Sequence, residues 1–377
     1  MMQGKPNVGI MSMQRIQNSG SFLQAYGLQH TLQGLGCKVQ FVDFHQEAPA
    51  GLKQKLKSSC PRLWGMVRQA KGVVQGQSRE ARETIRLSGS FEQRYDREFF
   101  PLLSEQKEWN YTPSLDLLVI GSDEVFNCAQ YADAGNSIPW ELYGEGSRAD
   151  RVISYAASFG ATTLEDLQRL GIREKAAELL GRFAHISVRD DNSAEIVHAL
   201  TGKTPEFHID PVLLYPFSEI PLEKPEPFDY ILVYAYNNRF QPEEVKQIQA
   251  FAKKQGKRLL CVNNFQDFCE EKRVASPLKV LSYFRFADFV VTDTFHGSVL
   301  SIKYNRPFGA FVRPSNRQKM SFLLHQFGLD SRKVETPQSL MEILETPVSY
   351  QSVSEILAQK QAESLAYLTG CLEDSVQ

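Results

Sequence analysis

A histidine follows a run of apolar residues at the expected start of a helix. Residues 288–298 read Asp-Phe-Val-Val-Thr-Asp-Thr-Phe-His-Gly-Ser, and Phe289–Val291 is typical of a strand buried on both faces. His296, Gly297 and Ser298 would then lie at a helix N-terminus, where free N–H groups and the helix dipole favour a phosphate or a carboxylate. Two interpretations stay open: an anion site with an acid–base histidine, or helix capping beside a structural histidine.

Small polar residues also follow the first predicted strand, Val8–Met11. Asn18, Gly20 and Ser21 precede an amphipathic run, Phe22–Leu35, and a second strand comes next, so the chain opens with a βαβ unit. In such a unit the loop after the first strand opens on the ligand side of the sheet. These residues are therefore candidate ligand contacts. Capping of the helix by Ser19 or Ser21 is the alternative.

Two more predicted strands end in residues that could contact a ligand. Leu115–Ile120 leads into Gly121, Ser122 and Asp123, where the glycine permits a sharp turn and the carboxylate arrives at the carboxyl edge of the sheet. A later strand, His185–Val188, leads into Arg189. A surface salt bridge is the alternative explanation for this arginine.

The wider pattern predicts an α/β protein with two doubly wound domains. A proline-rich stretch without a period separates them, as a linker would. The first domain contains a long helical stretch at 163–180, and a helix with an apolar stripe ends the chain. We predict the following division: N-terminal domain 1–215 with a helical insertion at about 51–105, linker 216–228, C-terminal domain 229–348, and C-terminal helix 349–377, whose stripe comprises Leu357, Ala358, Ala362, Leu365 and Leu368.

Within the insertion, residues 51–90 are rich in lysine and arginine and poor in acidic residues. A solvated helical hairpin is the favoured interpretation. Peripheral contact with an anionic membrane surface is the alternative, because basic helices with a few large apolar residues bind such surfaces.

Composition excludes several classes of protein. The 377 residues are 42% hydrophobic and 23% charged, and the net charge of −2 argues against a dedicated nucleic-acid binder. We expect a cytoplasmic protein, because the N-terminus lacks the long apolar stretch of a secretory signal and no segment has the length of a membrane span. The six cysteines and seven histidines are dispersed, so no metal site is predicted.

With these residues in place, the chain resembles the polysaccharide pyruvyl transferase family over nearly its whole length. The resemblance rests on the order and spacing of five motifs: Asn18-Ser19-Gly20-Ser21 with Leu23-Gln24-Ala25, Leu117–Asp123, Ile186-Ser187-Val188-Arg189-Asp190, Asp210-Pro211, and Phe295-His296-Gly297.

The resemblance implies an enzyme that moves the enolpyruvyl group of phosphoenolpyruvate onto two hydroxyls of a sugar, giving a pyruvate ketal and phosphate. It implies two Rossmann-like domains facing each other across a cleft, as in glycosyltransferases of the B type. The N-terminal domain is then the acceptor side and the C-terminal domain the donor side. Phosphoenolpyruvate is a substrate, no cofactor is expected, and the acceptor belongs to a cell-surface polysaccharide or a lipid-linked precursor.

By the same resemblance, His296 is the acid or base, and Asp123 acts on the sugar hydroxyl or hydrogen-bonds the acceptor. Arg189 is an anion clamp. The residues expected to bind substrate are Arg189, Asn18, Gly20, Ser21, Gly121, Ser122, Thr294, Gly297 and Ser298.

The chain departs from the family's pattern at one position. The pattern has an arginine two residues before the histidine, where this chain has Thr294. A hydroxyl binds an anion only as a neutral donor, so another cation is needed, and the candidates near in sequence are Arg285, Lys303, Arg306, Arg313 and Arg317. Two other functions remain: a nucleotide-sugar glycosyltransferase, and a non-catalytic glycan-binding protein that kept the fold.

Overall fold

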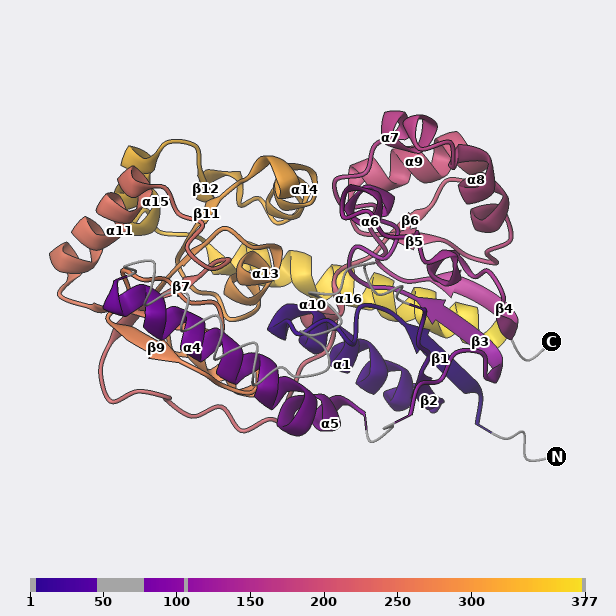
Figure 1. The fold of residues 1–377 in the computed structure, drawn as a ribbon, viewed down its shortest axis with the longest axis horizontal. Coiled ribbons are helices and arrows are strands. Elements are labelled where there is room, and N and C mark those ends of the chain that lie inside the picture. Colours follow the sequence, from indigo (N-terminus) through magenta and orange to yellow (C-terminus); the bar gives the residue numbers. More distant parts are fainter. Residues whose placement is uncertain (1–4, 46–77, 105–107, 375–377) are drawn as a thin grey trace.

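The computed structural model describes residues 5–45, 78–104 and 108–374. They form two α/β domains side by side, each built on a parallel sheet (Figure 1). The part of the predicted insertion between residues 51 and 77 lies outside the described residues, and with it all four lysines on which the membrane interpretation rests.

The N-terminal sheet has the order β2-β1-β3-β4 and is parallel throughout. Its strands are β1 (Asn7–Met11), β2 (Lys38–Phe41), β3 (Ser114–Ile120) and β4 (Arg148–Ser154). A short pair, β5 (Ser187–Val188) and β6 (Glu206–Phe207), continues the sheet through bridges from Ile153 to His185 and from Ala157 to Val188. Helices cover both faces, as the apolar strands require.

The helices of this domain include the one that the sequence predicts after the first strand. They are α1 (Ser19–Gly34), α4 (Arg79–Arg94), α5 (Phe100–Leu103), α6 (Cys128–Asp133), α7 (Leu164–Arg169), α8 (Arg173–Gly181), α9 (Asp191–Thr201) and α10 (Pro211–Leu214). The single helix predicted at 163–180 is wrong. Gly171 adopts a φ of 67° and ends the first helix, so two shorter helices, α7 and α8, form instead of one.

The C-terminal sheet has the order β12-β11-β10-β7-β8-β9. Its strands are β7 (Tyr230–Tyr234), β8 (Arg258–Val262), β9 (Glu271–Arg273), β10 (Phe289–Thr292), β11 (Phe308–Phe311) and β12 (Lys333–Val334). Its helices are α11 (Pro242–Gln255), α12 (Pro277–Arg285), α13 (Phe295–Lys303), α14 (Arg317–Gln326) and α15 (Leu340–Glu345). The strand order reverses between β7 and β10, and in sheets of this type the ligand crevice opens at that point.

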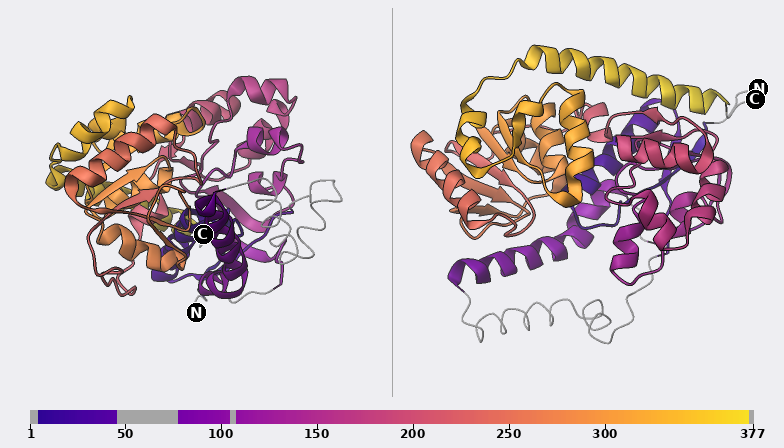
Figure 2. Two further views of the ribbon diagram at one scale, coloured as in Figure 1. Left: turned by 60° about the vertical axis from the view of Figure 1, so that its left-hand side comes forward. Right: turned by 90° about the horizontal axis from the view of Figure 1, so that it is seen from above.

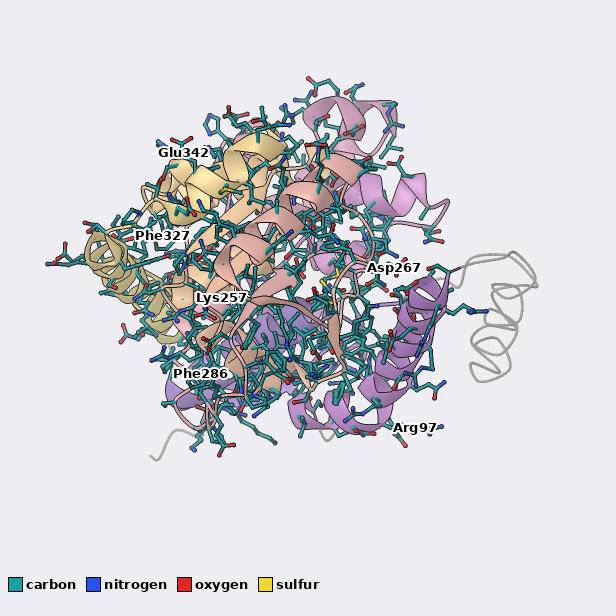
Figure 3. All side chains as sticks on the ribbon, turned by 90° about the vertical axis from the view of Figure 1, so that its left-hand side faces the viewer. Arg97, Lys257, Asp267, Phe286, Phe327 and Glu342 are labelled. Carbon is teal, nitrogen blue, oxygen red and sulfur yellow. The ribbon has the colours of Figure 1, made fainter. Side chains whose placement is uncertain are left out.

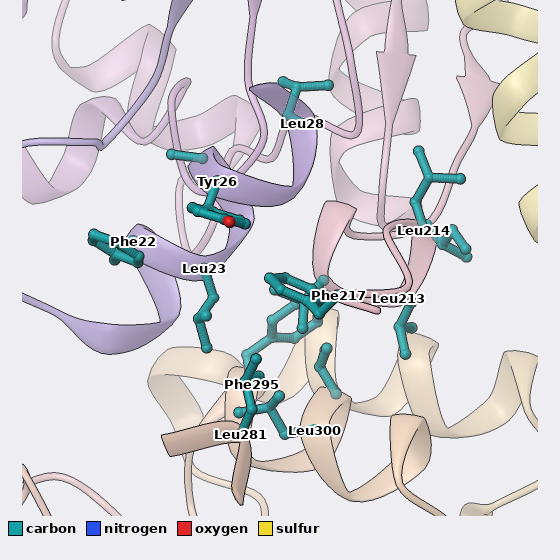
Figure 4. Packing of buried hydrophobic residues seen from close by; sticks show 14 of the residues in the cluster. Phe22, Leu23, Tyr26, Leu28, Leu213, Leu214, Phe217, Leu281, Phe295 and Leu300 are labelled. Carbon is teal, nitrogen blue, oxygen red and sulfur yellow. The ribbon is translucent and has the colours of Figure 1, made fainter. Parts of the chain in front are cut away.

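One apolar cluster joins the two domains. Leu23 of α1 points toward Leu281 of α12 and Leu300 of α13, with the segment around Phe217 packed beside them (Figure 4). Phe22 of α1 belongs to the same cluster. Because all five side chains are buried at 2% or less exposure, this contact is part of the core of the protein.

The C-terminal helix α16 (Tyr350–Glu373) runs back from the second domain over the first (Figure 2). Tyr367 donates a hydrogen bond to the carbonyl of Ser154 at 2.8 Å, and Gln361 to that of Leu213 at 2.7 Å. The predicted apolar stripe is partly wrong, since Leu365 is 39% exposed and the buried face includes Ser364 and Tyr367. Within the described residues, no helix is long and apolar enough to cross a membrane.

Helix α4 also crosses between the domains, on the side opposite α16 (Figure 2). Thr84 of this helix donates to Asp267 at 2.6 Å, and Lys272 lies 3.5 Å from Glu83. Figure 3 shows Asp267 beside the helix. The described part of the insertion is therefore docked on the C-terminal domain, which neither interpretation of the sequence included.

Candidate active site

A cavity of about 270 Å³, called the first cavity below, lies between the carboxyl ends of the two sheets. Its N-terminal wall follows β1 and β3, and its C-terminal wall follows β7, β8 and β10, as the topology requires. The lining residues are Met13, Ile16, Asn18, Ser21, Asp123, Glu124 and Gln130 from the first domain, and Tyr234, Tyr236, Asn264, Thr294, Phe295, His296 and Lys319 from the second.

His296 is the second residue of α13, and its ring lies against Gly20 at the start of α1. A Cβ atom on Gly20 would lie only 2.3 Å from His296 Nδ1 and 2.4 Å from Cγ. Glycine at position 20 therefore lets the histidine of one domain approach the backbone of the other. The histidine side chain is 12% exposed, and this exposed part faces the first cavity.

A buried chain of charges lies behind the histidine. His296 Nε2 is 3.6 Å from Asp210 Oδ2, and the same oxygen accepts a hydrogen bond from Arg189 at 2.9 Å. Burial alone would raise the pKa of Asp210, but His296 and Arg189 outweigh burial and lower it. Asp210 Oδ1 accepts from the N–H of Val212, so the carboxylate is fixed in place and can orient the imidazole.

Asp123 is held by three groups. Its carboxylate accepts hydrogen bonds from Ser21 at 2.8 Å, from Arg189 at 3.0 Å and from the N–H of Glu124 at 3.0 Å. Although burial opposes it, the positive charges of Arg189, His296 and Lys319 hold the pKa of Asp123 well below its usual range. Asp123 is consequently a weak base and a good hydrogen-bond acceptor.

Thr294 is the N-cap of α13. Its hydroxyl accepts from the N–H of Gly297 at 3.0 Å and lies 3.1 Å from the hydroxyl of Thr292. The N–H of Ser298 bonds the Thr294 carbonyl. Two of the N–H groups that the sequence suggested for an anion are thus engaged within the helix start itself.

Of the predicted site residues, His296, Asp123, Asn18, Ser21 and Thr294 line the first cavity. The remaining six do not line it and lie behind its wall, so their contact with substrate stays a prediction: Arg189, Gly20, Gly121, Ser122, Gly297 and Ser298.

The reason differs from one of these residues to the next. The side chain of Arg189 is 2% exposed and bound to two carboxylates, so it cannot clamp a substrate anion without breaking both ion pairs. Gly121 adopts a φ of 124°, and a Cβ there would lie 2.3 Å from the Tyr155 carbonyl oxygen. Ser122 donates to the carbonyl of Ala156, and Ser298 contacts Met320.

The family model described as "Polysaccharide pyruvyl transferase" matches residues 18–315 of this chain. The chain belongs to the polysaccharide pyruvyl transferase family. Apart from Met13, Ile16 and Lys319, all the residues that line the first cavity fall within the matched range. No match was found among curated proteins.

Solved structures with a similar fold include a putative UDP-N-acetylglucosamine 2-epimerase from Listeria monocytogenes. It has a TM-score of 0.50 and 9% identity, over 98% of this chain and 97% of that one. UGT89C1 of Arabidopsis thaliana gives 0.49 and 11% over 97% and 99%, and the calicheamicin glycosyltransferase CalG4 gives 0.45 and 13% over 99% of both. At these identities the first similarity shows the fold alone: two Rossmann-like domains of the B type of glycosyltransferase.

In this pyruvyl transferase family member, the cation at the site comes from α14. Among the described residues that line the first cavity, Lys319 is the only lysine or arginine. Its ammonium group pairs with Glu124 across the domain boundary and lies 5.5 Å from the ring of Phe295. None of the five cations suggested by the sequence lines the cavity. Arg313, for example, binds Glu244 at 2.7 Å.

Sequence reasoning missed Lys319, Tyr236, Asn264 and Gln130. Tyr236 and Asn264 follow β7 and β8, so the strand-end rule that selected Asp123 could have found them. No local sequence pattern indicates Lys319, because it lies on α14 and this helix reaches the site only through its packing in the folded protein. In the described part of the chain, no group of three or more His, Cys, Asp or Glu residues is arranged to hold a metal.

Proposed function

We propose that this protein transfers the enolpyruvyl group of phosphoenolpyruvate to two hydroxyls of a sugar in a cell-surface polysaccharide or its precursor. Membership of the family supports a transferase of this kind. The observation that carries the proposal is that His296 and Lys319 both line the C-terminal wall of one cavity. An acid–base group and a cation are what a donor with an enol ether, a carboxylate and a phosphate needs.

The reaction balances without a redox step. The methylene carbon of phosphoenolpyruvate gains a proton, and the neighbouring carbon forms bonds to two sugar oxygens while its bond to the phosphate oxygen breaks. The two hydroxyl protons end on the new methyl group and on phosphate. Protonation creates a cationic centre, so a donor placed at the carbon and a charge that holds the anion both lower the barrier.

The residues divide this work in the following way. His296 exchanges the proton, with Asp210 behind it to orient the ring. Lys319 binds the phosphate or the carboxylate of the donor. Asp123 accepts a hydrogen bond from the sugar hydroxyl, since its lowered pKa suits this role better than proton removal.

The reaction belongs in the cytoplasm, where phosphoenolpyruvate is made. A lipid-linked acceptor would bring the protein to the inner face of the membrane, and the basic segment 51–90 is our proposed contact. Removing residues 51–77, which leaves α4 in place, should then reduce sedimentation of the protein with vesicles that contain anionic lipid.

The test of the proposed function is phosphate release. The protein is mixed with phosphoenolpyruvate and a lipid-linked oligosaccharide fraction from the source cells, and free phosphate is measured over time. We expect His296→Ala to lose about a hundredfold or more of the rate, the usual range for a positioned acid–base group. His325→Ala is the matched control, because His325 is a 79% exposed histidine outside the first cavity.

Full activity in His296→Ala would overturn the assignment of this residue. Calorimetric binding of a nucleotide sugar, with none of phosphoenolpyruvate, would overturn the donor. Tight glycan binding without turnover of any donor would support the non-catalytic alternative instead.

A further inference from the structure

A second cavity, of about 440 Å³, opens beside the first. The two cavities share Glu124, Gln130, Tyr236, Phe295 and Lys319, so a ligand in one can react with a ligand in the other. The second cavity extends from these shared residues between α6 of the first domain and the segment before α14 of the second. If the donor occupies the first cavity beside His296, the second cavity is the space left for an acceptor.

Most polar groups of the second cavity already have partners. The amide of Asn127 donates to Glu124 at 2.6 Å and accepts from Thr162, and the amide of Asn316 donates to the carbonyl of Asp293. Arg239 donates to Ser315 at 2.8 Å and lies 3.4 Å from Asp293. These residues build the wall.

Two side chains of α6 can reach a ligand, and the Oε1 atom of one of them, Gln130, also accepts a 3.5 Å hydrogen bond from Asn127. Gln130 and Asp133 are both exposed and line the second cavity. They are three residues apart on one helix and therefore project from the same face. A carboxylate accepts hydrogen bonds and a carboxamide both donates and accepts, which matches neighbouring hydroxyl groups on a ring.

The opposite wall presents an aromatic ring. Tyr236 is 47% exposed, unusually so for a large side chain that follows a buried strand, and the guanidinium of Arg239 lies 5.2 Å from its ring centre. A tyrosine ring offers a rigid apolar surface at little entropic cost, against which the C–H face of a pyranose can pack.

The charges of the second cavity disfavour an anionic ligand. Arg239 is paired with Asp293, Lys319 is the residue that we assign to the donor in the first cavity, and the carboxylate of Asp133 lines the second cavity. Among the described residues of the second cavity, no further lysine or arginine would compensate the repulsion between a diphosphate and Asp133.

We propose that the second cavity is the acceptor subsite and takes an uncharged pyranose that packs on Tyr236 and hydrogen-bonds Gln130 and Asp133. The identification of the bound sugar as the acceptor rests on the proposed function. The sugar site itself is testable without any turnover, because binding can be measured on the full chain alone.

The experiment is saturation-transfer NMR with methyl β-glycosides of glucose, galactose, mannose and the two N-acetylamino sugars, each at millimolar concentration. We expect at least one glycoside to bind the wild type, and its affinity to fall about tenfold in Tyr236→Ala and in Gln130→Ala, a loss typical of a well-placed contact. Tyr236→Phe should keep binding, because it keeps the ring. Trp109→Ala is the control, since Trp109 is a 52% exposed aromatic outside both cavities.

Absence of binding to the wild type, or equal binding by all variants, would overturn the subsite. The result is distinguishable from failure of the proposed function. Sugar binding that depends on Tyr236, without any binding of phosphoenolpyruvate, would refute the donor and leave the sugar site in place. Phosphate release that depends on His296 but not on Tyr236 or Gln130 would refute the subsite alone.

Discussion

Arg189 lies between the carboxylates of Asp123 and Asp210, and its charge lowers the pKa of both. The side chains of Arg189 and Asp210 are 2% and 0% exposed, so neither charge is compensated by water. A buried charge that loses its partner is strongly destabilising, even where the pair as a whole adds little stability. The charge balance between Arg189 and its two carboxylates is therefore a condition for folding as well as for orienting His296.

We expect Asp210→Asn to lower the free energy of unfolding by about 3–5 kcal/mol near neutral pH, the usual effect of breaking a buried ion pair. Asparagine can still accept from the N–H of Val212, so the change isolates the charge. Because the folded-state pKa of Asp210 lies below its ordinary value of 3.8, the stability it contributes is complete above that value and is lost as the pH falls below it. Urea denaturation of both proteins along a pH series measures the difference.

The matched control is Asp190→Asn. Asp190 is also a buried helix N-cap, but its oxygens accept from Ser193 and Ser158 instead of pairing directly with a cation. A loss of stability for Asp210→Asn no larger than for Asp190→Asn, or one that persists unchanged into acid, would contradict the charge argument.

Lys319 supplies the positive charge that Thr294 lacks. We expect Lys319→Met to raise the KM for phosphoenolpyruvate about tenfold or more, because a charge-assisted contact contributes roughly 1.5–3 kcal/mol. Lys319→Arg should recover most of the affinity. The measurement is initial rate against donor concentration, with Lys333→Met, whose lysine binds Asp330 outside the first cavity, as the control. An unchanged KM in Lys319→Met would remove this residue from the donor site.

At the scale of one element, the start of α13 determines where His296 points. The Thr294 cap fixes the first turn, and Gly297 fits under it because a Cβ there would lie 2.0 Å from the Thr292 hydroxyl. Thr294→Val keeps the shape and removes the acceptor, so we expect it to lower stability by about 1 kcal/mol, and Thr294→Ser to be nearly neutral. Thermal unfolding of the three proteins tests this. Equal stability of the valine variant would mean that the cap is not needed.

The sequence predicted those elements whose signals are local. The strand that ends before Asp123 and the helix that begins beside His296 were both found from apolar runs and their polar ends. It could not show that Arg189 turns inward to two carboxylates, because that depends on Asp210 being brought beside Asp123 by the sheet. The docking of α4 on the second domain and the buried face of α16 likewise depend on contacts between distant residues.

At the scale of the whole molecule, several connections among the described residues hold the two domains together. They include the apolar cluster at α1, the ion pair of Lys319 with Glu124, and the helices α4 and α16 on opposite sides. Because the first cavity lies between the domains, any of these connections bears on the distance between His296 and Asp123. The predicted linker at 216–228 stays a prediction, although the described residues from Tyr215 to Asp229 contain no helix or strand.

A lysine of the C-terminal domain contacts the end of the N-terminal domain and makes this contact sensitive to pH. Lys303 of α13 donates to the carbonyl of Tyr215 at 2.6 Å, and burial lowers its pKa from 10.5 to about 8. Between these two values the unfolded chain binds a proton that the folded protein does not, so the stability of the wild type relative to Lys303→Met should rise with pH.

We expect this rise to amount to roughly 1–3 kcal/mol between about pH 7 and about pH 10, since one pKa unit corresponds to about 1.4 kcal/mol. Urea denaturation of both proteins at the two pH values measures it, and Lys246→Met, at a 72% exposed lysine, controls for titration elsewhere in the chain. The difference must grow in favour of the wild type, because the neutral amine keeps its hydrogen bond to Tyr215 while the penalty of burying a charge disappears. A difference that stays constant, or that falls as the pH rises, would show that Lys303 is hydrated at the junction and that the two domains are less tightly closed around it.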